Sequence, residues 1–281
     1  MAGALEITVS PSGNNNDQII INDALEAVYK SGGGRVVLNS GVYKVDNTVV
    51  IWSNTVLYGS PDAVIMVSPT SSQWFTGSVG IISCKEPVKN VEIYGFQVNG
   101  NLGAFDSSFA NTPGHDKDCM RCIILHGDSG NYADNIKIHH MKLYDSFSDG
   151  AYIYYATNVR IYDNFVSNTQ HEGFFLSVVI GAELYSNQIA GITSDCMRLD
   201  NSINCRIFDN IFFSYDGTNL NGAYKHGESG IQIGNQGFSH GYGSPKPTVT
   251  ANIEVFNNTF ANNGLKAILL GSGSNNNVYV H

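Results

Sequence analysis

The sequence predicts an all-β protein, a right-handed single-stranded parallel β-helix with an N-terminal capping α-helix. Three observations predict this fold. The composition is rich in turn and strand formers, one segment recurs every 23 residues, and a second segment lies between its copies at fixed offsets. Two short strands per repeat at constant spacing indicate a coil of stacked turns, in which each turn covers the open edge of its neighbour.

The composition favours short strands joined by tight turns. The 281 residues include 30 glycines, 15 tyrosines and 14 phenylalanines, together with many asparagines. Aromatic residues favour strands, whereas Gly and Asn favour turns. The net charge of −9 argues against a nucleic-acid-binding protein, which would carry a basic surface. No apolar run is long enough to predict insertion into a membrane.

The chain shows no linker, so we expect a single domain over residues 1–281, with 1–35 as its N-terminal cap region. The start shows no signal peptide, and the last repeat is cut off by the end of the chain. We therefore expect a mature or excised domain that is truncated at its C-terminal end or continues in a longer protein. The sequence leaves the oligomeric state open.

The cysteines are expected to be buried apolar side chains. Their odd number predicts no disulfide framework. The lone pair Cys119 and Cys122, in a CxxC spacing, lacks the four ligands of a zinc site, so we expect no metal there. The five are Cys84, Cys119, Cys122, Cys196 and Cys205.

The first recurring segment reads as apolar, charged or polar, apolar, then aromatic. Its copies at 136, 159, 182 and 205 start 23 residues apart. Further copies start at Val91, Ile253 and Val278. Most copies end on asparagine, and we expect these asparagines to stack and hydrogen-bond from turn to turn: Asn164, Asn187, Asn210 and Asn258.

The second segment follows the first by 14 residues in four turns, and the next first segment follows after 9. Alternation along a strand predicts inward side chains at two positions of each copy. These are Ile123, Leu125, Ala151, Ile153, Phe174, Leu176, Met197, Leu199, Ile231, Ile233, Ile268 and Leu270. The alternate positions point outward and form two columns: Ile124, Tyr152, Phe175, Arg198, Gln232 and Leu269, then His126, Tyr154, Ser177, Asp200, Gly234 and Gly271.

The N-terminal part predicts an amphipathic helix over Asp17 to Tyr29, with Asp17 as its N-cap and the run 32–34 of glycines ending it. Its apolar side would carry Ile20, Ala24, Leu25 and Val28. The strands 35–43 and 55–59 follow. We expect the helix to cover the open end of the first turn.

The outward columns predict a ligand groove. Exposed Tyr152, Tyr154 and Phe175 would stack on sugar rings, while Arg198 and Gln232 would bind carboxylate or hydroxyl groups. The alternative is a surface covered by long loops or by another subunit. Insertions of about 17, 11 and 14 residues flank these columns, and functional residues concentrate in such loops. The loop candidates are His115, Asp116, Tyr224, Lys225, His226, Glu228, His240 and Tyr242.

An acidic column lies directly before the second segments. Asp149, Glu172 and Asp195 would sit on consecutive turns, roughly 4.8 Å apart per step, with His171 beside Glu172. Crowded carboxylates raise one another's pKa, which yields a proton donor beside an ionised partner. The alternative is that these acids cap turn amides. Stacked carboxylates could also hold Ca²⁺, although catalysis by this site needs no cofactor.

The opening, with a helix, a Gly run, a strand and Gly41-Val-Tyr43, resembles pectate-lyase-like β-helix proteins. Residues 149–273 carry four further motifs: His171-Glu-Gly-Phe-Phe-Leu, Met197-Arg-Leu-Asp-Asn-Ser, Gly227-Glu-Ser-Gly-Ile-Gln-Ile-Gly and Glu254-Val-Phe-Asn-Asn-Thr-Phe. With these motifs in this order, the segment resembles disaggregatase-related β-helix proteins of methanogenic archaea. That resemblance implies cleavage of methanochondroitin, an acidic cell-surface polysaccharide, and an extracellular or cell-surface location. The family tends to show His-Asp-Gly where this chain has His171-Glu172-Gly173.

Three hypotheses follow from these residues. The leading one is a glycoside hydrolase on an acidic polysaccharide, with catalytic residues Asp149, Glu172, Asp195, Asp200, His171 and Arg198. Its substrate-binding residues would be His126, Tyr152, Tyr154, Phe175, Gln232, Lys225 and His226. The second is a lyase or epimerase on the same polymer, with Arg198, His171 or Tyr154 taking part. The third is a non-catalytic carbohydrate-binding or spike module.

Overall fold

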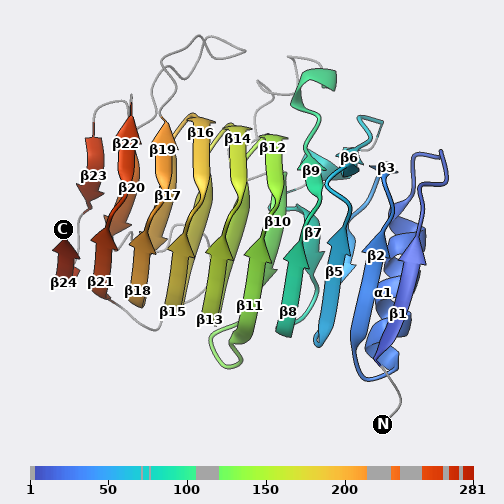
Figure 1. The fold of residues 1–281 in the computed structure, drawn as a ribbon, viewed down its shortest axis with the longest axis horizontal. Helices are drawn as coiled ribbons and strands as arrows, with labels where there is room; N and C mark the ends of the chain where they lie inside the picture. The colour runs from blue at the N-terminus through green and yellow to red at the C-terminus, as the bar shows by residue number, and fades with distance from the viewer. Residues whose placement is uncertain are drawn as a thin grey trace.

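The computed structural model describes residues 4–70, 72–75, 77–105, 120–213, 229–234, 249–261, 266–271 and 275–281. It is a right-handed parallel β-helix whose turns follow one another in chain order from the N-terminal to the C-terminal end (Figure 1). Every strand pairing in it is parallel, as the sequence predicts. Each turn presents three faces around one apolar core.

The first face is built from the first recurring segments. Its strands are β1 (Leu5–Val9), β2 (Gly34–Leu38), β5 (Thr55–Gly59), β8 (Lys89–Tyr94), β11 (Ala133–His139), β18 (Ile203–Phe208), β21 (Thr250–Phe256) and β24 (Asn275–Val280). The third face is built from the second segments. Its strands are β4 (Val49–Ile51), β7 (Gly80–Cys84), β10 (Arg121–His126), β17 (Asp195–Asp200), β20 (Ser229–Gly234) and β23 (Lys266–Leu270). Two long strands run through both faces: β13 (Ala151–Tyr162) and β15 (Phe174–Tyr185).

The second face was not predicted, since the sequence pattern indicates only two strands per turn. It forms a separate sheet of short strands between the other two faces. Most of these strands give two inward side chains or fewer, such as Val166 and Ile189, which is a weak pattern. They are β3 (Gly41–Val45), β6 (Ala63–Val67), β9 (Gln97–Asn99), β12 (Lys142–Ser146), β14 (Phe165–Thr169), β16 (Gln188–Ile192), β19 (Ile211–Phe213) and β22 (Thr259–Ala261). Two 3₁₀ turns complete the elements: Ser72–Phe75 and Leu102–Ala104.

The register between turns follows the repeat. Ile136 pairs with Val159, which pairs with Ala182, and Ile253 pairs with Val278. The last pair confirms the copy that starts at Val278. Because equivalent positions pair, each side chain meets its counterpart one turn away.

The core confirms the predicted inward positions of the second segments in all but the last turn. Ile123, Phe174 and Met197 are inaccessible to solvent, as are their inward partners two residues on. Leu270 is the exception, at 53 % exposed. Among the described strands, β23 pairs with β20 alone, so its other edge is open. The described cysteines also lie buried as free thiols: Cys84, Cys122, Cys196 and Cys205.

The N-terminal helix α1 (Gln18–Lys30) lies against the first turns, at the blue end of the chain (Figure 1). Asp17 occupies the N-cap position but makes no side-chain bond to the helix. Its carboxylate instead accepts hydrogen bonds from Ser12 and from the backbone N–H of Lys44. The expected apolar face was wrong by one residue, since Ile21 is fully buried whereas Ile20 is only half-buried.

The asparagine column stacks as predicted. Asn164 Nδ2 donates to Asn187 Oδ1 at 2.9 Å, and Asn187 Nδ2 donates to Asn210 Oδ1 at 3.0 Å. The same two amide groups also donate to the backbone carbonyls of Ile138 and Ile161. Each side chain thus satisfies polar groups at the bend between the first and second faces, where they are buried.

Aromatic rings form a second column, on the outside of the first face. Neighbouring rings stack nearly parallel, with centroids 4.5 to 5.5 Å apart. Because the rings stack on one another along the axis, they present mainly their edges to solvent. The column runs Tyr58, Tyr94, His139, Tyr162, Tyr185, Phe208, Phe256 and His281.

We expect Asn187→Ala to lower the free energy of unfolding by about 2–4 kcal/mol, because it leaves the buried backbone N–H of Asn164 and the amide group of Asn164 without their shared acceptor. Urea unfolding measures this loss. Asn15→Ala, at an exposed loop asparagine, is the control and should change the free energy of unfolding by less than about 0.5 kcal/mol.

Candidate functional site

Five of the six predicted catalytic residues come together at the bend that leads into the third face. The acidic column stacks as expected, since the backbone N–H of Gly150 donates to Glu172 O and that of Gly173 donates to Asp195 O, both at 3.1 Å. Side chains from four consecutive turns then join into one series of alternating charges. We name this series the buried charge chain; its members in order are Arg121, Asp149, His171, Glu172, Arg198 and Asp200.

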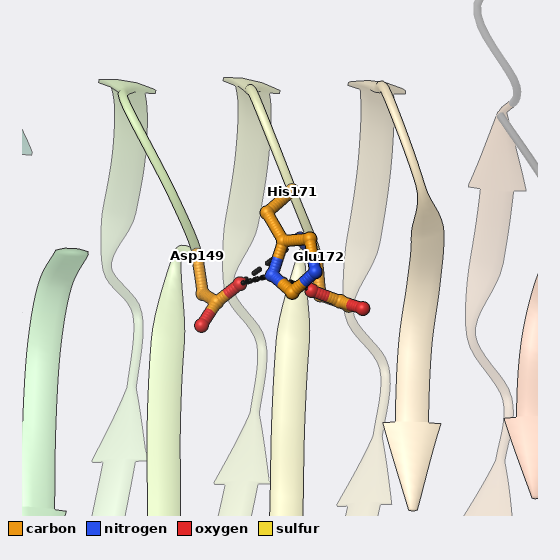
Figure 2. Close-up of side chains that lie close together, drawn as sticks. All are labelled: Asp149, His171 and Glu172. Atoms are coloured by element: carbon orange, nitrogen blue, oxygen red, sulfur yellow. Dashed lines mark hydrogen bonds and ion pairs between the residues drawn. The ribbon is translucent and has the colours of Figure 1, made fainter. Parts of the chain in front are cut away.

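His171 lies at the centre of the buried charge chain, between two carboxylates (Figure 2). Its Nδ1 atom is 2.7 Å from Asp149 Oδ1 and also forms an ion pair with Glu172 Oε2. The backbone N–H of Glu172 donates to the same Asp149 oxygen at 3.0 Å. One nitrogen atom therefore holds two acidic groups from neighbouring turns in fixed positions.

An arginine lies at each side of this trio. Arg121 Nε donates to Asp149 Oδ2 at 2.5 Å, and its Nη1 donates to Ser78 Oγ at 2.6 Å. Arg198 Nη1 donates to Glu172 Oε1 at 3.1 Å, while its Nε and Nη2 both donate to Asp200 Oδ2, at 3.1 and 2.9 Å. The guanidinium group of Arg198 thus fixes two carboxylates at once.

The buried charge chain is enclosed. The side chains of Asp149 and Glu172 are inaccessible to solvent, whereas those of His171 and Arg198 keep 14 % and 11 % of their surface exposed. Only these two and Asp200, at 6 %, offer a contact to a ligand from outside.

Burial and charge shift the pKa values of the acids in opposite directions. For Asp149, burial favours the neutral form, but the charges of Arg121 and His171 outweigh burial and lower its pKa well below the usual range. For Glu172, burial prevails over the opposing effects of His171 and Arg198 and raises its pKa to about 7. Burial would lower the pKa of His171, but Glu172 and Asp149 raise it to about 10. The pair therefore combines an ionised carboxylate with a carboxyl group that can carry a proton near neutral pH.

Asp195 stands apart from the buried charge chain. It lies one turn beyond Glu172, is almost inaccessible to solvent, and its Oδ1 accepts a short hydrogen bond from Ser229 Oγ. Arg121, in contrast, was not predicted as a site residue. A signal existed, because Arg121 precedes Asp149 in the column of residues that lead into the second segments.

The expectation of exposed sugar platforms on the third face is wrong. Tyr152, Tyr154 and Phe175 are at most 9 % exposed, and together with Ile124, Tyr155 and Val178 they form a second apolar cluster. The strand pattern sets their outward direction correctly but does not report what covers the face.

The ring faces in this cluster already have partners. Tyr152 stacks on Phe175 at 4.6 Å between ring centroids, and Tyr154 stacks on half-buried His126 at 4.8 Å. Arg121 lies over Tyr152, and Arg198 lies over Phe175, at 5.0 and 4.7 Å from the ring centroids. Gln232 is also buried, at 7 % exposed. The substrate-binding role of these residues stays a prediction.

The predicted loop candidates lie outside the described residues. They are His115, Asp116, Tyr224, Lys225, His226, Glu228, His240 and Tyr242, and Cys119 lies outside as well. Of the described residues, none belongs to a helix long and apolar enough to span a membrane.

Asp149, His171 and Glu172 offer ligand atoms that lie within 4.8 Å of one another, which is close enough to hold a metal ion. The carboxylate oxygens of the two acids, however, already face Arg121, His171 and Arg198. A divalent cation such as Ca²⁺ would have to displace these cations or share the oxygens with them against charge repulsion.

No family model matches the chain, and no curated protein matches its sequence. Its fold is similar to that of a hyperthermoactive exopolygalacturonase from Thermotoga maritima, with a TM-score of 0.67 and 13 % identity over 98 % of this chain and 70 % of that one. A polygalacturonase from Erwinia carotovora has a TM-score of 0.62 and 13 % identity, over 98 % of this chain and 96 % of that one. The enzymatically active domain of tailspike protein 2 from bacteriophage CBA120 has a TM-score of 0.60 and 14 % identity, over 92 % of this chain and 37 % of that one. These similarities show the fold, a right-handed parallel β-helix.

We expect the free energy of unfolding to fall as pH rises from about 4.5 to about 10. Glu172 has an ordinary pKa of 4.5 and a pKa of about 7 in the folded protein, so the stability it contributes is lost between these pH values. His171 has an ordinary pKa of 6.5 and a pKa of about 10 in the folded protein, so its contribution is lost between those. Urea unfolding at a series of pH values measures the decline. In His171→Gln the fall in the free energy of unfolding above a pH of about 7 should disappear. His281→Gln, at the last residue of the chain, is the control and should leave that fall unchanged. An unaltered upper decline in His171→Gln would contradict the assignment.

Proposed function

We propose that this protein is a glycoside hydrolase that cleaves a uronic-acid-containing polysaccharide at the cell surface or outside the cell. The observation that carries the proposal is the arrangement around Arg198, whose guanidinium group holds the raised-pKa Glu172 on one side and Asp200 on the other. Glycoside hydrolysis requires one carboxyl group that gives a proton and a second one that acts as base or nucleophile. Polygalacturonases and an active tailspike domain share this fold, which fits the substrate class.

Glu172 is the proton donor in this mechanism. Its carboxyl group is protonated below a pH of about 7 and can transfer the proton to the glycosidic oxygen. Asp200, which accepts hydrogen bonds from two Arg198 nitrogens, is the base or the nucleophile. Since solvent reaches His171 but not Glu172, the imidazole ring of His171 must swing aside when the sugar enters.

The remaining members of the buried charge chain position these groups. Arg121 fixes Asp149, and Asp149 accepts a hydrogen bond from the backbone N–H of Glu172, so Glu172 is positioned from the turn before it even when the ring of His171 moves. Arg198 keeps part of its surface accessible and can bind a uronate carboxylate. A methanochondroitin-like polymer, with its uronic acid units, is the substrate that the resemblance to disaggregatase-related proteins favours.

We expect Glu172→Gln to lower kcat on a uronate-containing polymer about 10²–10⁴-fold, because the amide group cannot donate the proton. Reducing-end assays with polygalacturonate and chondroitin measure the rate, and mass analysis should show products that have gained one water per cleavage. Glu183→Gln, at a half-exposed carboxylate on the first face, is the matched control and should keep the wild-type rate.

Three outcomes would contradict this proposal in different ways. Cleavage that survives in Asp149→Asn, Glu172→Gln, Asp195→Asn and Asp200→Asn would place the reaction elsewhere. Unsaturated products that absorb in the ultraviolet would identify a lyase, and inversion at C5 without cleavage would identify an epimerase. Binding of the polymer without any reaction would identify a carbohydrate-binding module.

Arg198→Lys should raise KM for the uronate polymer roughly tenfold, because lysine cannot form the two parallel hydrogen bonds that a guanidinium group makes with a carboxylate. The same polymer with its carboxyl groups reduced to alcohols should show no such rise. An equal change in KM for both polymers would show that Arg198 only positions Glu172 and Asp200.

A further inference from the structure

Two adjacent histidines face each other where strand β11 of the first face ends, in the turn that leads on to Asp149. His139 Nδ1 and His140 Nδ1 are 2.8 Å apart, and the two rings are nearly perpendicular, with an interplanar angle of 81°. Each ring also has a carboxylate near its other nitrogen: Glu92 Oε1 is 3.1 Å from His139 Nε2, and Asp163 Oδ2 is 3.8 Å from His140 Nε2.

The carboxylate of Glu92 bears on where the protons lie. A carboxylate accepts a hydrogen bond from an imidazole N–H, so the Nε2 atom of His139 that faces Glu92 carries hydrogen and its Nδ1 atom carries a lone pair. Without a ligand, Nδ1 of His140 donates to that lone pair across 2.8 Å. In the other tautomer of His140, with its hydrogen on Nε2 toward Asp163, both Nδ1 lone pairs point to one position that a cation can occupy.

The position of His139 is fixed before any ligand arrives. Its ring is stacked between Tyr94 and Tyr162, at 4.7 and 4.5 Å between centroids and nearly parallel to both. Only 8 % of the residue is exposed. A carboxylate that orients a histidine through the far nitrogen, as Glu92 does here, is the usual second partner of a metal-binding imidazole.

His140 departs from the pattern of the other turns. It has a left-handed backbone, with φ of 53°, at a bend where the other turns carry glycine or a small polar residue. Side chains other than Gly cost free energy in this conformation, and Asn, Asp and His tolerate it best. The equivalent residues are Gly95, Asp163, Ser186, Asp209 and Asn257.

A groove opens over the two histidines, between the first and second faces. Its volume is about 780 Å³, and its lining includes His139, His140, Asp163, Gln97 and Gln188. A cation held between the histidines would therefore keep open coordination positions toward water or toward an oxygen-bearing ligand in the groove.

We propose that His139 and His140 bind one divalent transition-metal ion, such as Zn²⁺ or Cu²⁺, through their Nδ1 atoms. Imidazole nitrogens suit these ions. Two nitrogens on a tetrahedral Zn²⁺ lie about 3.3 Å apart, so the pair needs to open by roughly half an ångström. His140, with 60 % of its side chain exposed, has the freedom to do so.

Titration of the untagged full chain with ZnCl₂ in a calorimeter tests the proposal, and electron paramagnetic resonance with Cu²⁺ reports the nitrogen ligands. We expect one ion per chain at this site, with two nitrogen ligands. His139→Tyr and His140→Asn, which match other turns of the same columns, should each weaken binding by about tenfold or more. Glu92→Gln should weaken it about 10–100-fold through loss of the orienting carboxylate.

His281→Tyr is the matched control, since His281 belongs to the same aromatic column but faces no other histidine among the described residues, and it should bind as the wild type does. Wild-type binding no tighter than that of the His139→Tyr/His140→Asn double variant would overturn the proposal and leave a shared proton between the rings. Binding that the double variant keeps but His171→Gln loses would overturn it as well, by placing the ion in the buried charge chain. Neither result depends on polysaccharide cleavage.

Discussion

The parallel pairing of successive turns is the constraint on which the rest of this structure depends. Once Ile136, Val159 and Ala182 are in register, every side chain is placed beside its counterpart about 4.8 Å away along the axis. Identical side chains are then favoured only where they can hydrogen-bond to each other or stack on each other. Asparagine does so through its amide group, which both donates and accepts, and aromatic rings do so through their faces.

Charged side chains cannot repeat in such a column without a counter-charge. The buried charge chain resolves this by alternating sign, with three basic and three acidic members from Arg121 to Asp200. Burying ions costs several kcal/mol each unless partners compensate, so removal of one member leaves its neighbours uncompensated. The same alternation distributes the protons unevenly, because Asp149 faces both Arg121 and His171 whereas burial dominates at Glu172.

Much of the fold could be predicted from sequence, because inward positions and the asparagine column follow directly from a periodic pattern. Less of the site could. The pattern placed Asp149, His171, Glu172 and Arg198 near one another, yet it could not show that Tyr152 and its neighbours are covered, since burial of an outer face depends on segments distant in sequence. The short strands of the second face were missed because so few of their residues point inward. The facing Nδ1 atoms of His139 and His140 could not be predicted, because they depend on the orientation of the two rings, which a sequence pattern does not show.

The regular register has a consequence for how the length of this chain can change. Between Asn164 and Asn210, loss or duplication of one 23-residue repeat would keep every column intact, because each side chain would stack on an equivalent residue of the next turn. A change by a single residue would instead turn every following side chain toward the opposite side of its strand. Such a molecule can therefore lengthen or shorten its surface in whole steps. A binding groove along its axis could gain or lose subsites in units of one turn while the capping helix α1 stays as it is.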